Sequence, residues 1–356
     1  MKKYYFFFVL ILILGCSKDR AVDPLPSWNE SVTKKAIIEF VKNSTEEGSK
    51  GFIQPEDRIA TFDNDGTLWS EVPTVEVSFI NSQLKQALAR NPALMKKEPF
   101  RTVTRYGEKA LTKLKMKDII IIMTTALSGM TEDEFASQTR TFLQTAQHPK
   151  YRVPYQNLTY KPMTELVSYL QQRGFKVYIC SGGDVAFMRV IAPEIYNIPP
   201  ENVIGAYFAD KAVDRAGKLV IMRTPKLITT NDQAEKPVNI LQRIGRRPVF
   251  AAGNVRSGGD IEHLRYSSEG SLPSLQLMIN HDDADREAAY SEPNNASLIA
   301  AKKFNWHVVS MKEDWKQIFN NLDTTNLTRV SKKEESKKLR AHLLPRRLSA
   351  KSEASR

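Results

Sequence analysis

The sequence predicts an α/β fold: a parallel sheet with helices on both faces, and a helical segment inserted into the chain. Short apolar stretches of strand length alternate with longer stretches of helical periodicity over residues 31–69 and 161–320, which is the pattern of a parallel sheet. Residues 70–160 instead hold several helical stretches and no clear strand alternation. We therefore predict that the first two ranges form one core and that residues 70–160 form a cap inserted between its two parts.

The expected core elements follow one another as short apolar strands and amphipathic helices. Strands are expected at residues 58–62, 175–180, 248–252, 275–279 and 306–310, and a hairpin-like stretch at 203–224. Core helices are expected at residues 31–42, 163–173 and 237–244. In the cap, Thr131 and Glu134 form the pattern of a capping box, which predicts a helix that begins there.

The composition is that of an ordinary globular protein of 356 residues, with 41% apolar and 26% charged residues. It excludes collagen-like, coiled-coil and wholly disordered chains. The two cysteines, Cys16 and Cys180, exclude a scaffold held together by disulfides. The formal net charge is +12, but nine Lys/Arg against three Glu in residues 331–356 contribute +6 of it. We expect no nucleic-acid binding, and residues 321–356 are predicted to form a disordered basic tail.

The N-terminus has the pattern of a secretory signal. Lys2 and Lys3 precede an apolar run at residues 4–14, which is too short for the about 20 residues that span a bilayer. The run ends in Gly15-Cys16, a pair that resembles a bacterial lipobox. This resemblance implies lipidation of Cys16, and a plain signal peptide with an incidental cysteine is the alternative.

We therefore expect a signal peptide at residues 1–15 and a polar, proline-containing tether at residues 16–30. The protein is expected to be a lipoprotein of the bacterial cell envelope that faces the periplasm. Its acyl chains would attach it to a membrane, with about 0.8 kcal/mol contributed by each buried CH₂. Ser17, which follows the cysteine, favours the outer membrane.

Polar side chains suited to chemistry follow the predicted strands where they end. Asp63 and Asp65 come directly after residues 58–62, and two carboxylates at that spacing suit a hard cation and acid–base chemistry. Ser181 and Gly182 follow the next core strand, where a hydroxyl and the N–H groups of a glycine-rich turn can hold a phosphate. Ligands of open parallel sheets bind beyond the carboxyl ends of the strands, so these residues are predicted to share one site.

The third core strand and the segment before it add the remaining candidates. Asn254 and Asp260 follow residues 248–252, and Lys236 lies at the start of the helix that precedes this strand. Lys226 is the alternative lysine, but Lys236 lies nearer to Asp260 in the chain and at a helix start. Together the acids, the hydroxyl and a lysine can hold a phosphate, a divalent cation and a nucleophile.

Two residues near these segments have open interpretations. Trp69 either lines a substrate entrance or packs between cap and core. His281, which Asp282 and Asp283 follow, either ligates a second metal or belongs to a turn with satisfied side chains. Cys180 lies inside an apolar strand and is expected to be a small buried hydrophobic residue rather than a redox group.

The segments at the strand ends resemble the motifs of the haloacid dehalogenase superfamily, and within it the phosphoserine-phosphatase-like acid phosphatases. The matching segments are FDNDGTLW (62–69), YICSGGD (178–184), NDQAEKPVNI (231–240), AAGNVRSGGDIEHL (251–264) and LMINHDDADRE (277–287). The resemblance covers about residues 55–315. It implies a Rossmann-like core with a helical cap inserted directly after the first motif.

The resemblance also implies a role for each matching residue. Asp63 is expected to be the nucleophile that becomes an aspartyl-phosphate, and Asp65 the general acid and base. Ser181 and the N–H group of Gly182 are expected to bind the phosphate. Lys236 is expected to neutralise Asp63 and the phosphate.

Mg²⁺ is the cofactor that the resemblance implies. The resemblance implies that the Asp63 carboxylate, the Asp65 carbonyl and Asp260 bind this ion. The chain departs from the family pattern at Asn254, which stands at the first position of the fourth motif, before a longer loop. Whether Asn254 or Asp260 contacts the metal directly is left open at this point.

These residues together predict Mg²⁺-dependent hydrolysis of a small phosphomonoester through an aspartyl-phosphate, with the cap closing over the site. A phosphotransferase or mutase that uses the same intermediate is one alternative. Another is a non-catalytic surface lipoprotein that binds an anionic polymer through residues 331–356. The presence of Asp63, Asp65, Ser181 and Lys236 together argues against it.

Overall fold

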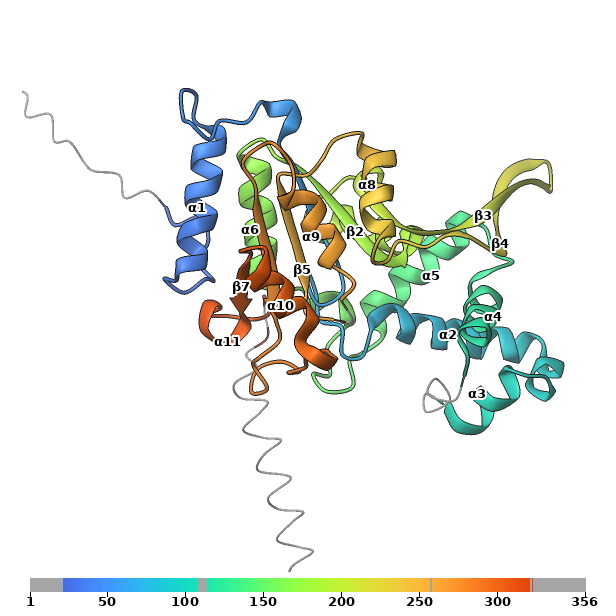
Figure 1. Cartoon of the computed structure of the whole chain (residues 1–356). Coiled ribbons are helices and arrows are strands. Elements are labelled where there is room, and N and C mark those ends of the chain that lie inside the picture. The colour runs from blue at the N-terminus through green and yellow to red at the C-terminus, as the bar shows by residue number, and fades with distance from the viewer. Residues whose placement is uncertain (1–21, 108–113, 257, 321, 323–356) are drawn as a thin grey trace, which may run out of the picture.

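The computed structural model describes residues 22–107, 114–256, 258–320 and 322 (Figure 1). The described part of the protein is built around a seven-stranded sheet in the order β4-β3-β2-β1-β5-β6-β7. All neighbouring strands are parallel except β3 and β4, which are antiparallel. The predicted α/β fold with a mostly parallel sheet is confirmed.

The strands lie close to their predicted positions. They are β1 (Ile59–Phe62), β2 (Lys176–Asp184), β3 (Val203–Arg215), β4 (Lys218–Thr229), β5 (Phe250–Asn254), β6 (Leu275–Asn280) and β7 (His307–Ser310). β2 runs beyond its predicted end at residue 180 and includes Ser181 and Gly182, and β5 includes Asn254. β1 lies between β2 and β5, so the ends of the three strands are adjacent. β3 and β4 form one long hairpin. Its turn residues Ala216 and Gly217 have φ values of 56° and 76°, as two-residue hairpin turns of type I′ require.

Helices cover both faces of the sheet. They are α1 (Val32–Thr45), α2 (Val75–Arg90), α3 (Phe100–Tyr106), α4 (Met116–Leu127), α5 (Glu132–Thr145), α6 (Lys161–Gln172), α7 (Val185–Tyr196), α8 (Glu235–Ile244), α9 (Ile261–Ser268), α10 (Ala296–Lys303) and α11 (Met311–Asp314). Alternate residues of a strand point to opposite faces. In β2, Ile179 therefore joins the core under α1, α6 and α7, whereas Cys180 packs with Ile240 of α8. Cys180 is buried in an apolar cluster, as expected.

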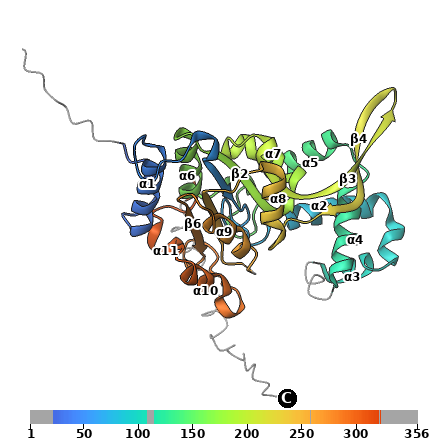
Figure 2. The same ribbon diagram turned by 45° about the horizontal axis from the view of Figure 1, so that its top comes forward.

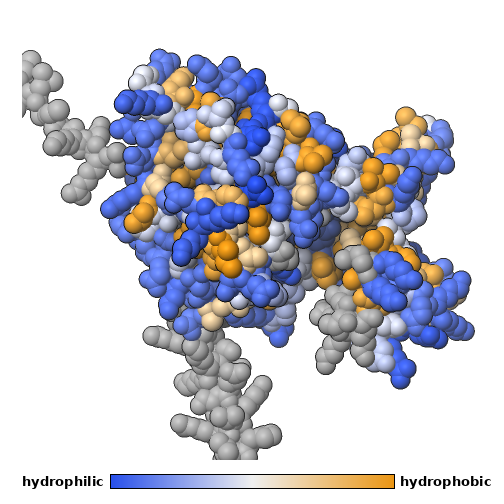
Figure 3. All heavy atoms as spheres, in the orientation of Figure 1, coloured by the Kyte–Doolittle hydropathy of each residue, from blue (hydrophilic) through white to orange (hydrophobic). Residues whose placement is uncertain are grey.

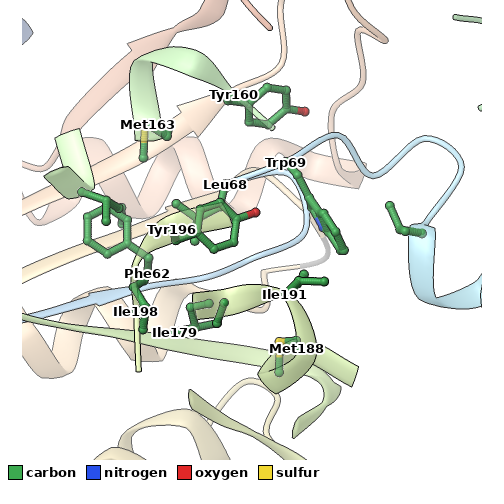
Figure 4. Close-up of a cluster of buried hydrophobic side chains, with 14 of the residues drawn as sticks. Phe62, Leu68, Trp69, Tyr160, Met163, Ile179, Met188, Ile191, Tyr196 and Ile198 are labelled. Atoms are coloured by element: carbon green, nitrogen blue, oxygen red, sulfur yellow. The ribbon is translucent and has the colours of Figure 1, made fainter. Parts of the chain in front are cut away.

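The loop that follows β1 is anchored by a buried cluster. Figure 4 shows Leu68 and Trp69 beside side chains of α6, β2 and α7, among them Met163, Ile179 and Ile191. Leu68 and Trp69 are fully buried. Because protein interiors are close-packed, this contact holds the loop in one position beside the end of β1.

The helices α2, α3 and α4 and the outer half of the β3–β4 hairpin form a lobe beside the sheet (Figures 1 and 2). The helices of the lobe lie within the residues predicted for the cap, and Thr131 and Glu134 form the predicted capping box at the start of α5. The lobe also includes the hairpin, because β4 packs against α4 and Met222 pairs with Thr131. The lobe therefore combines two segments that are far apart in the chain. Its role as a closing cap stays a prediction.

The predicted tether is wrong over its described part, residues 22–30. Leu25 and Trp28 are fully buried, and the Trp28 indole Nε1 donates to the Pro162 carbonyl at 3.0 Å. Trp28 also packs edge-on against Trp315, with ring centroids 6.1 Å apart. The polar, proline-containing composition around these two large apolar side chains suggested a tether, but their burial ties the segment to the core.

The predicted signal peptide at residues 1–15, the lipidation site Cys16 and all but one residue of the basic tail lie outside the described residues. Among the helices that are described, none has the length and apolar character needed to cross a membrane.

Candidate active site

The polar residues predicted at the strand ends lie around one cavity of about 600 Å³. The predicted residues that line it are Asp63, Asp65, Ser181, Gly182, Lys236, Asn254 and Asp260. Other parts of the lining come from α2, α4, β3 and β4, so the cavity lies between the strand ends and the lobe. The structure thus brings together every predicted catalytic, phosphate-binding and metal-binding residue.

Lys236 joins two of the predicted acids. Its Nζ donates to Asp63 Oδ1 at 2.8 Å and to Asp260 Oδ1 at 2.6 Å, and all three side chains are buried. Burial and the Asp260 carboxylate raise the pKa of Asp63, although Lys236 opposes this. Despite burial, the two carboxylates hold the pKa of Lys236 above its usual value, so the lysine stays charged. Lys226, the alternative in the sequence, is exposed on β4.

Asp65 lies in the same cavity, and its carboxyl group is oriented from within its own loop. The Trp69 indole Nε1 donates to Asp65 Oδ1 at 2.8 Å. Burial and the neighbouring Glu71 raise the pKa of Asp65 to about 6. An acid with this pKa can both give and take a proton near neutral pH. Trp69 is fully buried, so it packs inside the protein and orients Asp65 rather than lining an entrance.

Ser181 is held by the segment that also carries Lys236. The Asn231 side chain donates from Nδ2 to the Ser181 carbonyl at 2.9 Å, and Asn239 donates to Asn231 Oδ1 at 2.9 Å. Ser181 Oγ accepts a hydrogen bond from the Gly183 N–H at 3.3 Å. The glycine-rich turn and the lysine are therefore positioned by one connected set of hydrogen bonds.

Asn254 is held by a polar cluster that sequence reasoning missed. Its Nδ2 donates to Glu71 Oε1 at 2.7 Å and to the Tyr290 hydroxyl at 3.1 Å. Tyr290 and Arg256 both donate to the Glu71 carboxylate. These contacts turn the amide nitrogen of Asn254 toward Glu71 and its Oδ1 away from Glu71. Glu71 and Tyr290 stand far from Asn254 in the chain, so only the fold reveals the cluster.

The oxygen atoms around Asp63 are of the kind that bind a hard divalent cation. Both oxygens of the Asp260 carboxylate already have partners, Lys236 and the Asn254 N–H at 3.1 Å. The Asn254 Oδ1 is therefore a better candidate for direct ligation than Asp260. The described residues contain no group of three or more His, Cys, Asp or Glu side chains placed to hold a metal. A site made of the Asp63 carboxylate, the Asp65 carbonyl and an amide oxygen would need water and phosphate as its further ligands, as is usual for Mg²⁺.

A further buried acid, Glu76, lies at the start of α2. Both of its carboxyl oxygens are 3.1 Å from the N–H nitrogen of Asp184, the last residue of β2; we call residues 181–184, at the end of this strand, the glycine-rich turn. Asp184 also accepts from Arg223 of β4, whose guanidinium carbon lies 4.0 Å from the Phe135 ring centroid. The turn is therefore held by a helix and a strand of the lobe. Sequence reasoning missed these residues because no local pattern marks contacts between such distant segments.

Glu76→Gln is expected to stabilise the protein at alkaline pH. Burial and the nearby Asp184 raise the pKa of Glu76 from 4.5 to about 8. The folded state then binds the proton more tightly than the unfolded chain does. The free energy of unfolding therefore falls as the pH rises from 4.5 to about 8. Glutamine can still accept from the Asp184 N–H and carries no charge.

Urea unfolding in EDTA should therefore show Glu76→Gln more stable than the wild type by about 1–3 kcal/mol at pH 8.5, and nearly equal to it at pH 4. Glu47→Gln, at an exposed position, is the control and should show no such trend. A difference between Glu76→Gln and the wild type that is the same at both pH values would contradict the charge argument.

His281 supports the loop after β1. Its Nε2 lies 2.8 Å from the Gly66 carbonyl oxygen, and its Nδ1 lies 3.5 Å from Glu287 Oε2. The ring stacks on Tyr290, with centroids 4.1 Å apart. Both ring nitrogens thus have partners, which favours the turn with satisfied side chains over a second metal site.

Residues 58–223, slightly less than half of the chain, match the family model of haloacid dehalogenase-like hydrolases. By this match, the stretch resembles the haloacid dehalogenase-like hydrolases. The matched stretch contains Asp63, Asp65 and Ser181, whereas Lys236 and Asn254 lie beyond it. No curated protein matches the chain.

Solved structures also resemble the protein. A conserved protein of unknown function from Anaerococcus prevotii has a TM-score of 0.51 at 16% identity, over 80% of this chain and 92% of that one. At this identity the likeness concerns the fold alone. A protein of unknown function from Bordetella pertussis has a TM-score of 0.45 at 16% identity, over 71% of this chain and 97% of that one. A probable phosphoserine phosphatase from Vibrio cholerae has a TM-score of 0.39 at 14% identity, over 78% of this chain and 66% of that one.

Proposed function

We propose that the domain hydrolyses phosphomonoesters of small molecules through a phosphorylated Asp63. The observation that carries this proposal is the buried Asp63 carboxylate, 2.8 Å from the Lys236 ammonium and in the same cavity as Asp65 and Ser181. A carboxylate that attacks a phosphate dianion needs nearby positive charge, and the leaving oxygen needs an acid. In this cavity Lys236 would supply the positive charge and Asp65 the acid.

The residues divide the reaction into two displacements. Since Lys236 holds Asp63 Oδ1, we assign the attack on phosphorus to Asp63 Oδ2. The P–O bond to the leaving group breaks, and Asp65 gives its proton to the departing oxygen. The Asp65 carboxylate then takes a proton from water, whose oxygen attacks the phosphorus and releases Asp63 and phosphate. Ser181 and the glycine-rich turn hold the phosphate oxygens during both displacements.

Mg²⁺ is the proposed cofactor. The residues that would hold it are Asp63 through its carboxylate, Asp65 through its carbonyl and Asn254 through its amide oxygen. When bound, the ion offsets the negative charge that accumulates on the phosphate oxygens. The charge balance supports this proposal, because the buried carboxyl groups of Asp63 and Asp260 share the ammonium group of Lys236, and Asp65 is half-buried in the same cavity.

Phosphate release from a panel of alkyl and aryl phosphates should require Mg²⁺. We expect EDTA to reduce release to background and Mg²⁺ to restore it. Ca²⁺ should not replace Mg²⁺, because it takes more ligands at about 2.3–2.6 Å and disturbs in-line geometry. Release into water without an alcohol acceptor separates a hydrolase from a phosphotransferase or mutase. Full activity in EDTA would reject the metal, and no release from any ester with Mg²⁺ would reject the function.

We further propose that the domain acts at the periplasmic face of a membrane, anchored through a lipid on Cys16. The support is the Gly15-Cys16 pair after a short apolar run. Mass spectrometry of the mature protein should find the acyl groups on Cys16, and Cys16→Ser should leave an unlipidated precursor while Ser17→Ala is still lipidated. An unmodified Cys16, or a mature chain that begins elsewhere, would contradict the anchor.

A further inference from the structure

The cavity has a polar end at Asp63, Ser181 and Lys236 and an apolar wall on the side of the lobe. Apolar side chains from α2, α4, β3 and β4 make up this wall: Val77, Ile120, Met123, Ala206, Phe208 and Leu227. Figure 3 shows further apolar side chains, in orange, along the hairpin and where it meets the helices of the lobe. The part of the cavity beyond the phosphate position is thus bounded by hydrocarbon.

The apolar wall is only partly covered by protein. Val77 is 36% exposed, and Ile120, Met123 and Leu227 are half-buried. Water against such side chains is released when an apolar group takes its place, and the gain grows with the apolar area covered. A ligand with a hydrocarbon portion next to its phosphate would fill both ends of the cavity.

The charges of the lining disfavour a second anionic group on that ligand. Among the described lining residues, the cations are Lys236 and Arg256. Lys236 is already paired with Asp63, and Arg256 with Glu71. The exposed carboxylate of Asp232 lines the same space. An additional phosphate or carboxylate would therefore meet acids rather than a cation in need of a partner.

We propose that the substrate is the phosphomonoester of an apolar alcohol or phenol, with its carbon atoms against Val77, Ile120 and Leu227 and no second anionic group. This inference rests on the proposed function. In the reaction the ester P–O bond breaks, and the alcohol leaves with the proton of Asp65. Water supplies the fourth oxygen of the phosphate product. Sugar phosphates, nucleotides and bisphosphates are expected to be poor substrates.

The first test uses the full chain with Mg²⁺ and a series of methyl, propyl, butyl and hexyl phosphates. Each CH₂ that moves from water to the wall should raise kcat/KM about fourfold until the cavity is filled. Glycerol phosphate, which has the three carbons of propyl phosphate and two added hydroxyl groups, should be poorer than propyl phosphate by about tenfold or more. A series that is flat or falls with chain length overturns the inference.

A second comparison isolates the charge. Hexane-1,6-bisphosphate has the same carbon chain as hexyl phosphate and a second anionic group at its far end. We expect its kcat/KM to be at least about tenfold lower, since that group meets the acids of the lining. An equal or higher value overturns the exclusion of a second anion.

Matched variants test the wall itself. Ile120→Ser and Leu227→Ser should lower the hexyl-to-methyl ratio of kcat/KM by about tenfold each, chiefly through KM, because uniform binding is lost. Their neighbours Ile121 and Ile228 are 42% and 45% exposed and do not line the cavity, so Ile121→Ser and Ile228→Ser should leave the ratio unchanged. Turnover of methyl phosphate reports that each variant is folded. Equal ratios in all four variants overturn the assignment of the wall.

Binding of alkylphosphonates separates this inference from the proposed function. Their C–P bond is not hydrolysed, so calorimetry with methyl-, butyl- and hexylphosphonate measures the wall without turnover. Tighter binding with each CH₂ supports the apolar wall even if no ester is cleaved, and that result would reject only the proposed hydrolysis. Hydrolysis of esters with no dependence of binding or kcat/KM on chain length would reject only the apolar leaving group.

Discussion

Replacing Asp63 with asparagine is expected to abolish the phosphoenzyme and to lower turnover by roughly 10⁴-fold or more, because the nucleophile is lost. Asparagine has nearly the same shape, and its Oδ1 can still accept from Lys236, which lies 2.8 Å from this position in the wild type. Lys236 also keeps its second partner, Asp260. The fold should therefore survive, and the loss should appear in kcat. Steady-state kinetics and rapid-quench detection of covalent phosphate measure the two effects.

The matched control for this substitution is Asp133→Asn, which removes an exposed carboxylate on α5 far from the strand ends in the chain. It should retain full activity and form the phosphoenzyme. Covalent phosphate on the Asp63→Asn variant, or a loss of less than tenfold, would show that another residue is the nucleophile.

Asp65→Asn is expected to have the second largest effect, since general acid–base catalysis contributes typically about 10²–10⁴-fold. The new amide oxygen can still accept from the Trp69 indole, so the geometry of the loop is retained. The formation of the phosphoenzyme should fall most for alkyl phosphates, whose leaving oxygen needs a proton. It should fall less for aryl phosphates, whose phenolate leaves more readily.

The second displacement should be slow in Asp65→Asn for both substrates, because the same carboxylate activates water. Rapid-quench experiments should therefore show a burst of phosphoenzyme with an aryl phosphate. Equal losses in the burst phase for aryl and alkyl phosphates would contradict the assignment of Asp65 as the acid. Burial and Glu71 raise the pKa of Asp65 to about 6, which agrees with a group that changes its protonation state in each catalytic cycle.

The residues at the strand ends were predictable because each follows a short apolar stretch: in the structure Asp63 lies directly after β1, and Ser181 and Asn254 are among the last residues of β2 and β5. In a parallel sheet, the ends of neighbouring strands meet at one edge, so the order along the chain was enough to group Asp63, Ser181 and Asn254. Lys236 could be preferred over Lys226 because it lies at the start of a helix near Asp260. The structure confirms the sheet and places these residues around one cavity. Their chemical roles stay predictions.

What could not be predicted depends on contacts between distant segments. Glu71 contacts Asn254 and Glu76 contacts Asp184 across more than 100 residues of sequence, and neither acid stands in a local pattern that marks it. Arg223 was assigned to a hairpin of the core, but it joins the lobe to the glycine-rich turn. The tether was wrong where Trp28 is buried, because local composition does not show which surface an apolar side chain will meet.

The most direct test of the central claim is to locate the covalent phosphate on the wild-type chain. The protein is mixed with Mg²⁺ and an aryl phosphate, quenched within milliseconds and treated with borohydride, which reduces an aspartyl-phosphate to homoserine. Peptide mass spectrometry should then find homoserine at position 63 and unmodified aspartate at position 65. Phosphate on Ser181, reduction at any residue other than Asp63, or no reduced residue during steady turnover would contradict the account.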